Sequence, residues 1–473
     1  MPTDPRGLRA DAPLLDAWLR FHESAPTPFT IPGHKHRTDL VGDVVAGDVP
    51  LYAGLDTMRL SAGVLADAEA RAARAWGVDL CRFSVGGSTH GNQALALAVG
   101  RPGDRVVVAR TLHRSMLLGL VLAGLEPVWV RPRVDPAVGL PVGVVADDLE
   151  ATLAAAPDAV AVFVGDPSYV GTVGDVGALA AVAHARDVPL VVDAAWGAHL
   201  GFHPDLPRHA LDAGADALVT SAHKTLPAVS QGALVLARSG RIDPARFDAA
   251  VEATATTSPN GAILASIDAA RALLERDGRR LLGDLVATVA DARRRLAAVP
   301  GLVVLDGAGV DPTRLVVVLA GTGADGVAVE ADLLARGRPV EMADRDTVVA
   351  MVTMADTPET VGGLVAALGA AVEERRGAPR PVAGSGVWAV APEVATSPRE
   401  AFFAPRETVP FAAAVGRVAA ELVAPYPPGV PVLAPGEVVT AATLAALEAA
   451  RAAGSRIAYA ADPTLATLDV VAR

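Results

Sequence analysis

The chain has 473 residues, and 51% of them are hydrophobic while only 4% are aromatic, so alanine and valine must fill much of a large core. Its formal net charge of −12 provides no basic footprint for nucleic acid, and no uninterrupted apolar stretch reaches the roughly 20 residues of a membrane helix. The single cysteine, Cys81, excludes an intrachain disulfide, and the first ten residues lack the apolar core of a signal peptide, which favours the cytoplasm.

The first 60 residues are expected to form an N-terminal arm. Leu14–Phe21 predicts a short helix. The following segment, Thr27–His36, has two prolines within five residues, which favours extended backbone. This segment is either a linker or an arm that lies across an active site or a partner subunit.

A glycine-rich turn follows a predicted helix at Ala62–Trp76. Gly86 and Gly87 let the backbone approach a ligand, and Ser88 and Thr89 can cap the helix that follows. Free amides at a helix start favour an anion such as phosphate, although most such turns are only helix caps. The turn is therefore a candidate phosphate site that needs support from its context.

Strand and helix patterns alternate from Arg105 to Ala237. The expected strands are Arg105–Ala109, Pro127–Val130, Ala159–Val164, Leu190–Val192, Ala217–Thr220 and Gly232–Ala237. The expected helices are Ser115–Leu122, Asp147–Ala155, Asp175–Ala185 and Arg208–Ala213. Such repeats predict right-handed crossovers and a mainly parallel sheet, which places the chain in the α/β class.

Two of these buried strands end in charged residues. Asp193 stops the run Leu190–Val192, and Lys224 follows Ala217–Thr220 after a short polar turn. In open α/β sheets ligands bind beyond the carboxyl ends of the strands, so we expect the acid and the lysine to meet in a cleft. Pyridoxal phosphate (PLP) uses such a pair, because a lysine holds it as a Schiff base and a carboxylate keeps its ring nitrogen protonated.

Other residues at the same rim have two interpretations each. His113 could stack on a pyridine ring or cap the next helix, and Trp196 could border the ring or fill the core. By themselves, Lys224 could be a solvated lysine and Asp193 a strand-end cap or a metal ligand. The order of the glycine turn, Asp193 and Lys224 along the chain favours the cofactor.

The second half of the chain predicts two further domains. Long helices are expected at Ala262–Glu275 and Arg279–Ala298, followed by strands at Leu302–Leu305, Arg314–Leu319 and Thr347–Met351 and helices at Val327–Arg336 and Thr360–Arg375. Residues 376–386 are linker-like. We therefore divide the chain into an arm (1–60), a large PLP-binding domain (61–275), a small α/β domain (276–380) and a C-terminal domain (387–473).

Rival motifs are weaker. Gly321–Gly326 follows a strand and formally matches a dinucleotide fingerprint with Glu341 beyond it, yet the segment is too short for a full dinucleotide fold. The histidine pairs His34/His36 and His199/His203 lack a third ligand that the sequence can identify, so no metal site is predicted.

Several motifs together resemble the Orn/Lys/Arg decarboxylase family, in its shorter bacterial arginine/lysine-decarboxylase-like branch. They run from about Pro28 to Glu437 and include Thr27-Pro-Phe-Thr-Ile-Pro-Gly-His-Lys, Gly86-Gly-Ser-Thr-His-Gly-Asn, Leu112-His-Arg-Ser, Asp166-Pro-Ser-Tyr-Val-Gly, Val192-Asp-Ala-Ala-Trp-Gly-Ala-His, Ser221-Ala-His-Lys-Thr, Ser397-Pro-Arg-Glu and Tyr426-Pro-Pro-Gly. The resemblance implies a fold-type I PLP enzyme, similar to aspartate aminotransferase, that is an obligate dimer or higher homo-oligomer with active sites at the subunit interface. It also implies a distinct C-terminal domain and a place in polyamine biosynthesis.

The resemblance also assigns roles by position. Lys224 would be the Schiff-base lysine, Asp193 the partner of the ring nitrogen and His113 the stacking residue. The residues around the phosphate would be Gly87, Ser88, Thr89, Ser221 and His223. One departure is Asp193-Ala-Ala-Trp196, where shorter members have Asp-Glu-Ala-His, and Leu55–Gly63 is a loose match to an acidic, His-containing segment.

The resulting hypothesis is decarboxylation of arginine, lysine or ornithine. His223 or Lys224 would return a proton to Cα. The cationic side chain of the substrate needs an acidic partner, for which Glu400, Glu407 and Glu437 are candidates. The alternatives are another fold-type I reaction, such as that of an aminotransferase or an aldolase-type lyase, and a non-catalytic PLP-binding protein.

Overall fold

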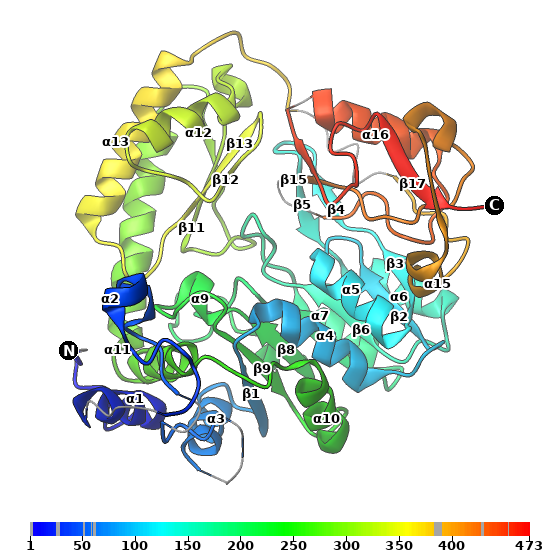
Figure 1. Cartoon of the computed structure of the whole chain (residues 1–473). Coiled ribbons are helices and arrows are strands. Elements are labelled where there is room, and N and C mark those ends of the chain that lie inside the picture. The colour runs from blue at the N-terminus through cyan, green and yellow to red at the C-terminus, as the bar shows by residue number, and fades with distance from the viewer. Residues whose placement is uncertain are drawn as a thin grey trace.

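The computed structural model describes residues 3–24, 29–50, 53–57, 59, 63–382, 390–426, 430–452 and 454–473. Three parts surround a common centre in Figure 1: a seven-stranded sheet with its helices below, a four-stranded sheet at the upper left, and the C-terminal part at the upper right. Thr27 and Pro28 of the predicted arm, and the last residues of the motif that starts at Tyr426, lie outside the described residues. No helix in the described ranges is long and apolar enough to cross a membrane.

The seven-stranded sheet is the base of the molecule. Its strands are β1 (Leu80–Ser84), β2 (Arg105–Ala109), β3 (Glu126–Val130), β6 (Val162–Gly165), β7 (Leu190–Asp193), β8 (Ala217–Thr220) and β9 (Ala233–Ala237). They lie in the order β1-β9-β8-β7-β6-β2-β3. The five strands from β8 to β3 pair in parallel, whereas β9 pairs antiparallel with both of its neighbours, β8 and β1. The prediction of a mainly parallel α/β sheet is therefore confirmed.

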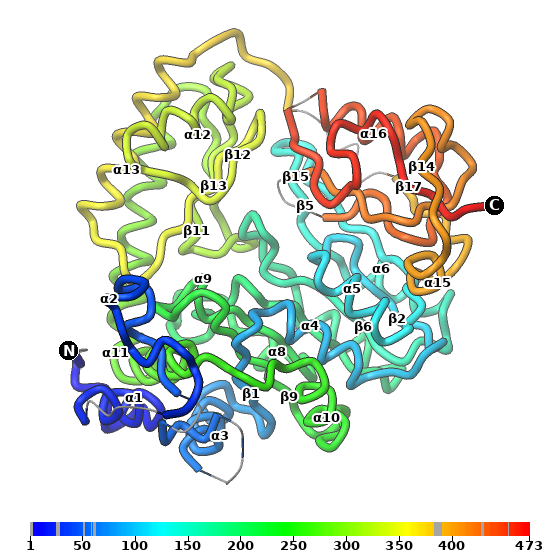
Figure 2. Tube along the Cα trace, viewed as in Figure 1, coloured from blue at the N-terminus to red at the C-terminus, as the bar shows by residue number. Residues whose placement is uncertain are grey.

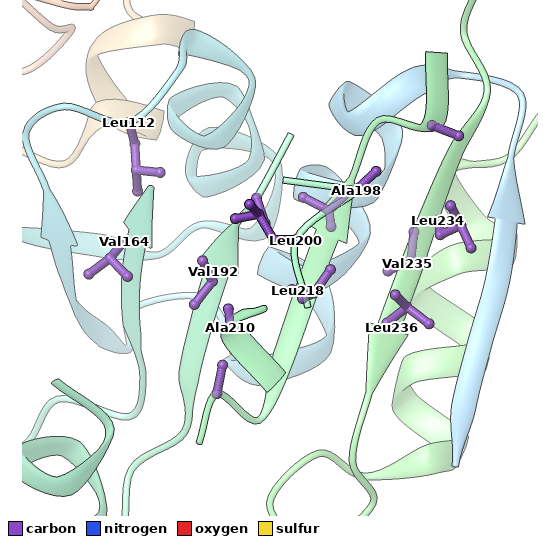
Figure 3. Packing of buried hydrophobic residues seen from close by; sticks show 14 of the residues in the cluster. Leu112, Val164, Val192, Ala198, Leu200, Ala210, Leu218, Leu234, Val235 and Leu236 are labelled. Atoms are coloured by element: carbon purple, nitrogen blue, oxygen red, sulfur yellow. The ribbon is translucent and has the colours of Figure 1, made fainter. Parts of the chain in front are cut away.

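Branched and small apolar side chains hold this sheet together. Val164, Val192, Leu218 and Val235 come from four neighbouring strands, as Figure 3 shows, and each is at most 3% exposed. A strand buried on both faces reads as an unbroken apolar run, so the polar residue at its carboxyl end stands out in the sequence. This is why Asp193 could be recognised from the sequence.

Helices connect and cover these strands. They are α3 (Val64–Ala75), α4 (Gly87–Val99), α5 (Arg114–Ala123), α6 (Ala146–Ala155), α7 (Val176–His184), α8 (Ala210–Ala213), α9 (Ala222–Thr225) and α10 (Pro244–Thr254). A small hairpin of β4 (Arg133–Asp135) and β5 (Leu140–Gly143) follows β3. The expected helices between residues 105 and 237 all exist, with ends shifted by one or two residues.

One long helix, α11 (Gly261–Ala297), replaces the two helices expected at Ala262–Glu275 and Arg279–Ala298, so that prediction was wrong. The gap between the two expected helices contains Gly278, and a glycine inside a helix costs about 1 kcal/mol relative to alanine. Buried Leu274 and Leu282 on either side of Gly278 compensate, because both pack into the core. The helix contacts β1 of the large sheet and β10 and β11 of the small one, and so joins the two.

The four-stranded sheet is antiparallel throughout. Its elements are β10 (Val303–Val304), β11 (Arg314–Val318), β12 (Met342–Ala343) and β13 (Thr347–Met351), with α12 (Gly326–Ala335) and α13 (Pro358–Glu374). Gly321–Gly326 lies in the turn after β11, and a side chain at Gly323 would clash with the backbone of Gly377. Close packing of this turn against the backbone that follows α13 thus accounts for a glycine in the apparent dinucleotide motif.

The C-terminal region, defined as residues 390–426, 430–452 and 454–473, has its own apolar core. Its elements are α15 (Pro398–Phe403), β14 (Arg406–Pro410), β15 (Ala424–Tyr426), α16 (Ala441–Ala452), β16 (Arg456–Ala458) and β17 (Thr467–Val471). The N-terminal helices α1 (Pro13–Ser24) and α2 (Thr38–Val41) lie on the opposite side of the molecule in Figure 2, and α1 packs against α11.

Candidate active site

A cavity of about 1170 Å³ opens where the three parts meet. The predicted residues that line it are Gly87, Ser88, Thr89, His113, Asp193, Trp196, Ser221, His223 and Lys224. The carboxyl ends of β2, β6, β7 and β8 point their loops into this space, as expected for an open α/β sheet. The structure therefore brings together all the residues predicted to bind the cofactor.

Lys224 lies in the short helix α9, directly after β8. Its Nζ is 3.7 Å from the centre of the Trp196 ring. The pKa of the Lys224 amine is lowered to about 8, mainly by burial. The carboxylates of Asp193 and Glu341 oppose this shift, and the charge of Arg314 adds to it. A far larger share of neutral amine is thus present near neutral pH than for an ordinary lysine, and the neutral amine is the nucleophile.

Asp193 ends β7 and is 7% exposed. Its Oδ2 accepts a hydrogen bond of 2.7 Å from Nδ2 of Asn92, and its Oδ1 accepts one of 3.1 Å from the amide of Ala195. Asn92 is fully buried in α4. These donors fix the carboxylate in one orientation, which a partner for a buried ring nitrogen requires.

His113 is tied to the same network. Nδ2 of Asn92 also donates to Oγ of Ser115 at 2.8 Å, and that hydroxyl lies 2.9 Å from Nδ1 of His113. His113 caps α5, because its side chain accepts from the amide of Ser115, so the capping interpretation is confirmed. It also lines the cavity, and its stacking on a pyridine ring stays a prediction. Burial lowers the pKa of His113, while the charge of Asp193 opposes that shift.

The glycine turn differs from expectation in one respect. Helix α4 begins at Gly87, so Ser88 and Thr89 lie within its first turn and neither caps it with a side chain. Ser88 Oγ instead lies 2.7 Å from Ser221 Oγ, which joins the turn to the Lys224 loop. Amides in the first turn of a helix have no intrahelical acceptor, so the start of α4 can still bind an anion.

His223 directly precedes Lys224 in α9 and also lines the cavity. Its Nδ1 lies 2.9 Å from the carbonyl oxygen of Gly232, which can only accept, so Nδ1 carries the proton. This bond leaves Nε2 as the atom of His223 that can exchange a proton.

The far end of the cavity contains residues that the sequence did not identify. The hydroxyl of Tyr169 donates to Oε1 of Glu341 at 3.0 Å, and the Tyr169 ring meets the Trp196 ring edge-on with centroids 5.0 Å apart. Burial and the charge of Glu341 raise the pKa of Tyr169, and Tyr426 adds to the shift. Tyr169 comes from the loop after β6, Glu341 from the residue before β12, and Tyr426 from β15.

A second acid at a strand end, Asp166, also lines the cavity. Its Oδ1 accepts from the amide of Gly174 at 2.6 Å. Burial raises the pKa of Asp166 to about 7, that hydrogen bond opposes the shift, and the charge of Asp311 adds to it. Asp311 itself is bound to the buried His199, which lies outside the cavity lining and joins the loop after β7 to the segment before β11.

The three acids predicted to hold the substrate side chain lie elsewhere. Glu437 forms a buried ion pair with Arg110, Glu400 caps α15 through Ser397, and the exposed Glu407 pairs with Arg417. None of the three lines the cavity. Sequence position could not exclude them, because their partners are up to 327 residues away in the chain.

The missed residues left weak signals or none. Asn92 is a polar residue in the apolar helix α4, and Ser115 follows His113, so both could have been suspected from their motifs. Tyr169 and Glu341 are 172 residues apart and belong to different sheets, so only the folded chain brings them together.

Comparison with known proteins identifies the family of this chain. The family described as "Orn/Lys/Arg decarboxylase, major domain" matches residues 12–320, and its C-terminal domain matches residues 385–457. An arginine decarboxylase from Halalkalibacterium halodurans is 32% identical over 97% of both chains.

Solved structures agree on the fold. The lysine decarboxylase LdcF of Francisella novicida superimposes with a TM-score of 0.82 at 18% identity, covering 97% of this chain and 80% of that one. A serine palmitoyltransferase from Sphingomonas wittichii gives a TM-score of 0.55 at 16% identity, covering 78% and 85%. Two further structures of such an enzyme, both described as containing PLP, have the same fold, which is that of the fold-type I PLP enzymes. The chain therefore belongs to the Orn/Lys/Arg decarboxylase family, and it is a pyridoxal-phosphate-dependent decarboxylase of basic amino acids.

Proposed function

We propose that Lys224 carries pyridoxal phosphate, that Asp193 anchors the ring nitrogen, and that the enzyme decarboxylates L-arginine. The observation that carries this proposal is the shared cavity of Lys224 and Asp193, where the amine has a lowered pKa and the carboxylate is fixed by Asn92. An ordinary core needs neither this amine nor this carboxylate for its packing, since burying a charged group costs stability.

The residues present fit the cofactor. A ring placed against His113 would have the oriented carboxylate of Asp193 available for its nitrogen. The first turn of α4 and the hydroxyls of Ser88 and Ser221 offer donors for a phosphate. The cavity of about 1170 Å³ has room for the cofactor and an amino acid together.

The cofactor, when bound, supplies an electron sink for the bond that breaks at Cα. The residues of the chain prepare this chemistry. Asp193 stabilises a positive charge on the ring nitrogen, and Asn92 keeps the carboxylate from rotating. His113 limits the tilt of the ring. Lys224, or Nε2 of His223, gives the proton to Cα after CO₂ has left.

Glu341 is proposed as the partner of the cationic side chain. It lines the cavity, and its charge acts on both Lys224 and Arg314, so it lies near the place where the reaction occurs. The Tyr169 hydroxyl binds only one of its two carboxylate oxygens. A guanidinium can bind a carboxylate with two parallel hydrogen bonds, and an ammonium can bind it with one.

Arginine is the first candidate because the relative named arginine decarboxylase matches 97% of this chain at 32% identity. The test is a product assay with arginine, lysine and ornithine at equal concentrations. We expect CO₂ and agmatine from arginine, with a higher kcat/KM for arginine than for lysine or ornithine. Formation of a keto acid, or equal turnover of all three substrates, would contradict the proposal.

We also propose that the enzyme acts as a homodimer. The arm after residue 28 exposes large apolar side chains, with Phe29 93% and Val44 85% exposed, and water-exposed apolar surface of this kind favours association. Sedimentation analysis of the purified protein should give twice the mass of 48.0 kDa. Replacing Phe29 and Val44 by serine should shift the equilibrium toward the monomer.

A further inference from the structure

The loop that carries His113 has an arginine near each end. Arg110 follows β2, and Arg114 is the first residue of α5. Both arginines turn away from the strands that precede them and meet the C-terminal region. The histidine proposed to stack on the cofactor thus lies between two contacts with a part of the chain that is more than 300 residues away.

The first contact is a buried ion pair. Nη1 of Arg110 lies 2.5 Å from Oε1 of Glu437, and Nη2 donates to Oε2 at 2.8 Å and to the carbonyl of Val432 at 3.0 Å. Oε2 of Glu437 also accepts from the amide of Ala434. The guanidinium lies 4.6 Å from the centre of the Trp129 ring, and both charged residues are at most 6% exposed.

Such a pair fixes geometry more than it adds stability. Removing two charges from water costs about as much free energy as their attraction returns, so apolar residues of the same size could hold the two parts equally well. A bidentate pair, however, allows one relative orientation of its partners. Arg110 is therefore suited to set the position of the loop.

The second contact is an aromatic one. The guanidinium carbon of Arg114 lies 3.9 Å from the centre of the Tyr459 ring. Nε of Arg114 is buried and has no hydrogen-bond partner among the described residues, and the guanidinium rests on the ring face of Tyr459. Tyr459 also lines the cavity, next to the wall that α16 provides.

The rest of α5 rests on the same region. Leu117 packs with Leu422 and Ala434, and Nη1 of Arg399 donates to the carbonyl of Val121 at 2.8 Å near the end of the helix. The C-terminal region thus contacts α5 along its length, but only the contacts of Arg110 and Arg114 lie beside His113.

We propose that the C-terminal region is a working part of the cofactor site, because Glu437 and Tyr459 act as positioning residues that hold His113 against the ring. The position of His113 matters beyond stacking, since Ser115 and Asn92 link it to Asp193. The inference rests on the proposed role of His113, and it adds that the loop holding it is set from outside the seven-stranded sheet.

The test compares Tyr459→Leu with Tyr459→Phe and with Arg399→Ala. Phenylalanine keeps the ring face, and Arg399 contacts the far end of α5, so both serve as controls. We expect hydrogen–deuterium exchange of residues 111–115 to become faster in Tyr459→Leu alone. This readout needs no cofactor, so it tests the positioning of the His113 loop by the C-terminal region even if PLP proves not to bind at Lys224.

The second readout is the dissociation constant of PLP, followed by its visible absorbance in the purified proteins. Loss of a partly exposed cation–π contact should raise this constant about two- to fivefold in Tyr459→Leu and leave it unchanged in both controls. In a His113→Ala background Tyr459→Leu should have no further effect, because its influence passes through the histidine.

Two results would overturn the proposal. One is unchanged exchange at residues 111–115 in Tyr459→Leu. The other is an equal loss of affinity with and without His113, which would mean that Tyr459 meets the cofactor directly. Glu437→Gln keeps the shape of the buried pair without its charge and should give the same pattern if Tyr459→Leu does not fold. Failure of Lys224→Ala to abolish the visible band would instead contradict the proposed function.

Discussion

The two ends of the cavity are built differently. At the lysine end, Asp193, Asn92, Ser115 and His113 form a chain of hydrogen bonds between 2.7 and 2.9 Å. Asp193 ends β7, and the other three residues lie in or directly before the helices α4 and α5 of the same large sheet. At the far end, Glu341 and Tyr169 share one hydrogen bond of 3.0 Å and come from different sheets. The lysine end is thus held by hydrogen bonds within one part of the molecule, whereas the far end depends on how the parts of the molecule meet.

This difference has a functional meaning. A cofactor is the same molecule in every turnover, so its site gains from fixed donors. A substrate must enter and leave, and substrates of related enzymes differ in length. Drawing the far end from three parts of the chain lets its residues change without disturbing the sheet that holds the cofactor.

The largest effect is expected for Lys224→Ala. The amine is the attachment point of the cofactor, so CO₂ release should fall to the background of the assay and the visible absorbance of lysine-bound PLP should disappear. Lys35→Ala, in the N-terminal arm, is the matched control and should keep both. Retained absorbance in Lys224→Ala would mean that the cofactor is not attached at the lysine end of the cavity.

Asp193→Asn should come next. It keeps the shape of the side chain but removes the charge that stabilises a protonated ring nitrogen, so kcat should fall by about 10²- to 10³-fold. KM for arginine should change little, because Asp193 lies at the lysine end. A change confined to KM would mean that this carboxylate binds the substrate instead.

Glu341→Gln tests the far end. Losing a charge-assisted hydrogen bond should raise KM for arginine by about 10- to 100-fold, with a smaller change in kcat. Tyr169→Phe removes one hydrogen bond from a neutral donor to the same carboxylate and should raise KM about fivefold. Steady-state kinetics separates the two parameters, and an unchanged KM in Glu341→Gln would place the cationic side chain elsewhere.

The smallest effect concerns pH. Burial lowers the pKa of Lys224 to about 8, and only the neutral amine can react. In cofactor-free protein the rate of PLP capture should therefore rise with pH and reach half its maximum near pH 8. Glu341 holds this pKa up, so Glu341→Gln should move the midpoint to lower pH. A midpoint above pH 10 would mean that the lysine is solvated.

Much of the lysine end could be predicted from the sequence because its residues lie at the ends of buried strands. Asp193 and Lys224 interrupt apolar runs, and Gly86 and Gly87 precede a helix, so local pattern and chain order were sufficient. The error at Gly278 has the opposite cause, since the leucines that keep α11 continuous act through tertiary packing, which overrides local propensity.

The far end could not be predicted for a physical reason. Glu341 precedes a two-residue strand and resembles any exposed acid in the sequence, while Glu437 looks like a substrate ligand only until Arg110 is placed beside it. Contacts between residues hundreds of positions apart leave no local pattern. The domain division at 60, 275 and 380 stays a prediction, although the two sheets and the C-terminal region follow one another in that order.

The most direct test of the account uses the fact that the chain has two lysines, Lys35 and Lys224. Borohydride reduction of the PLP-loaded protein fixes the cofactor to its lysine, and peptide mass spectrometry then identifies the modified residue. We expect the phosphopyridoxyl group on the peptide that contains Lys224. Modification of Lys35 alone, or of neither lysine, would contradict it.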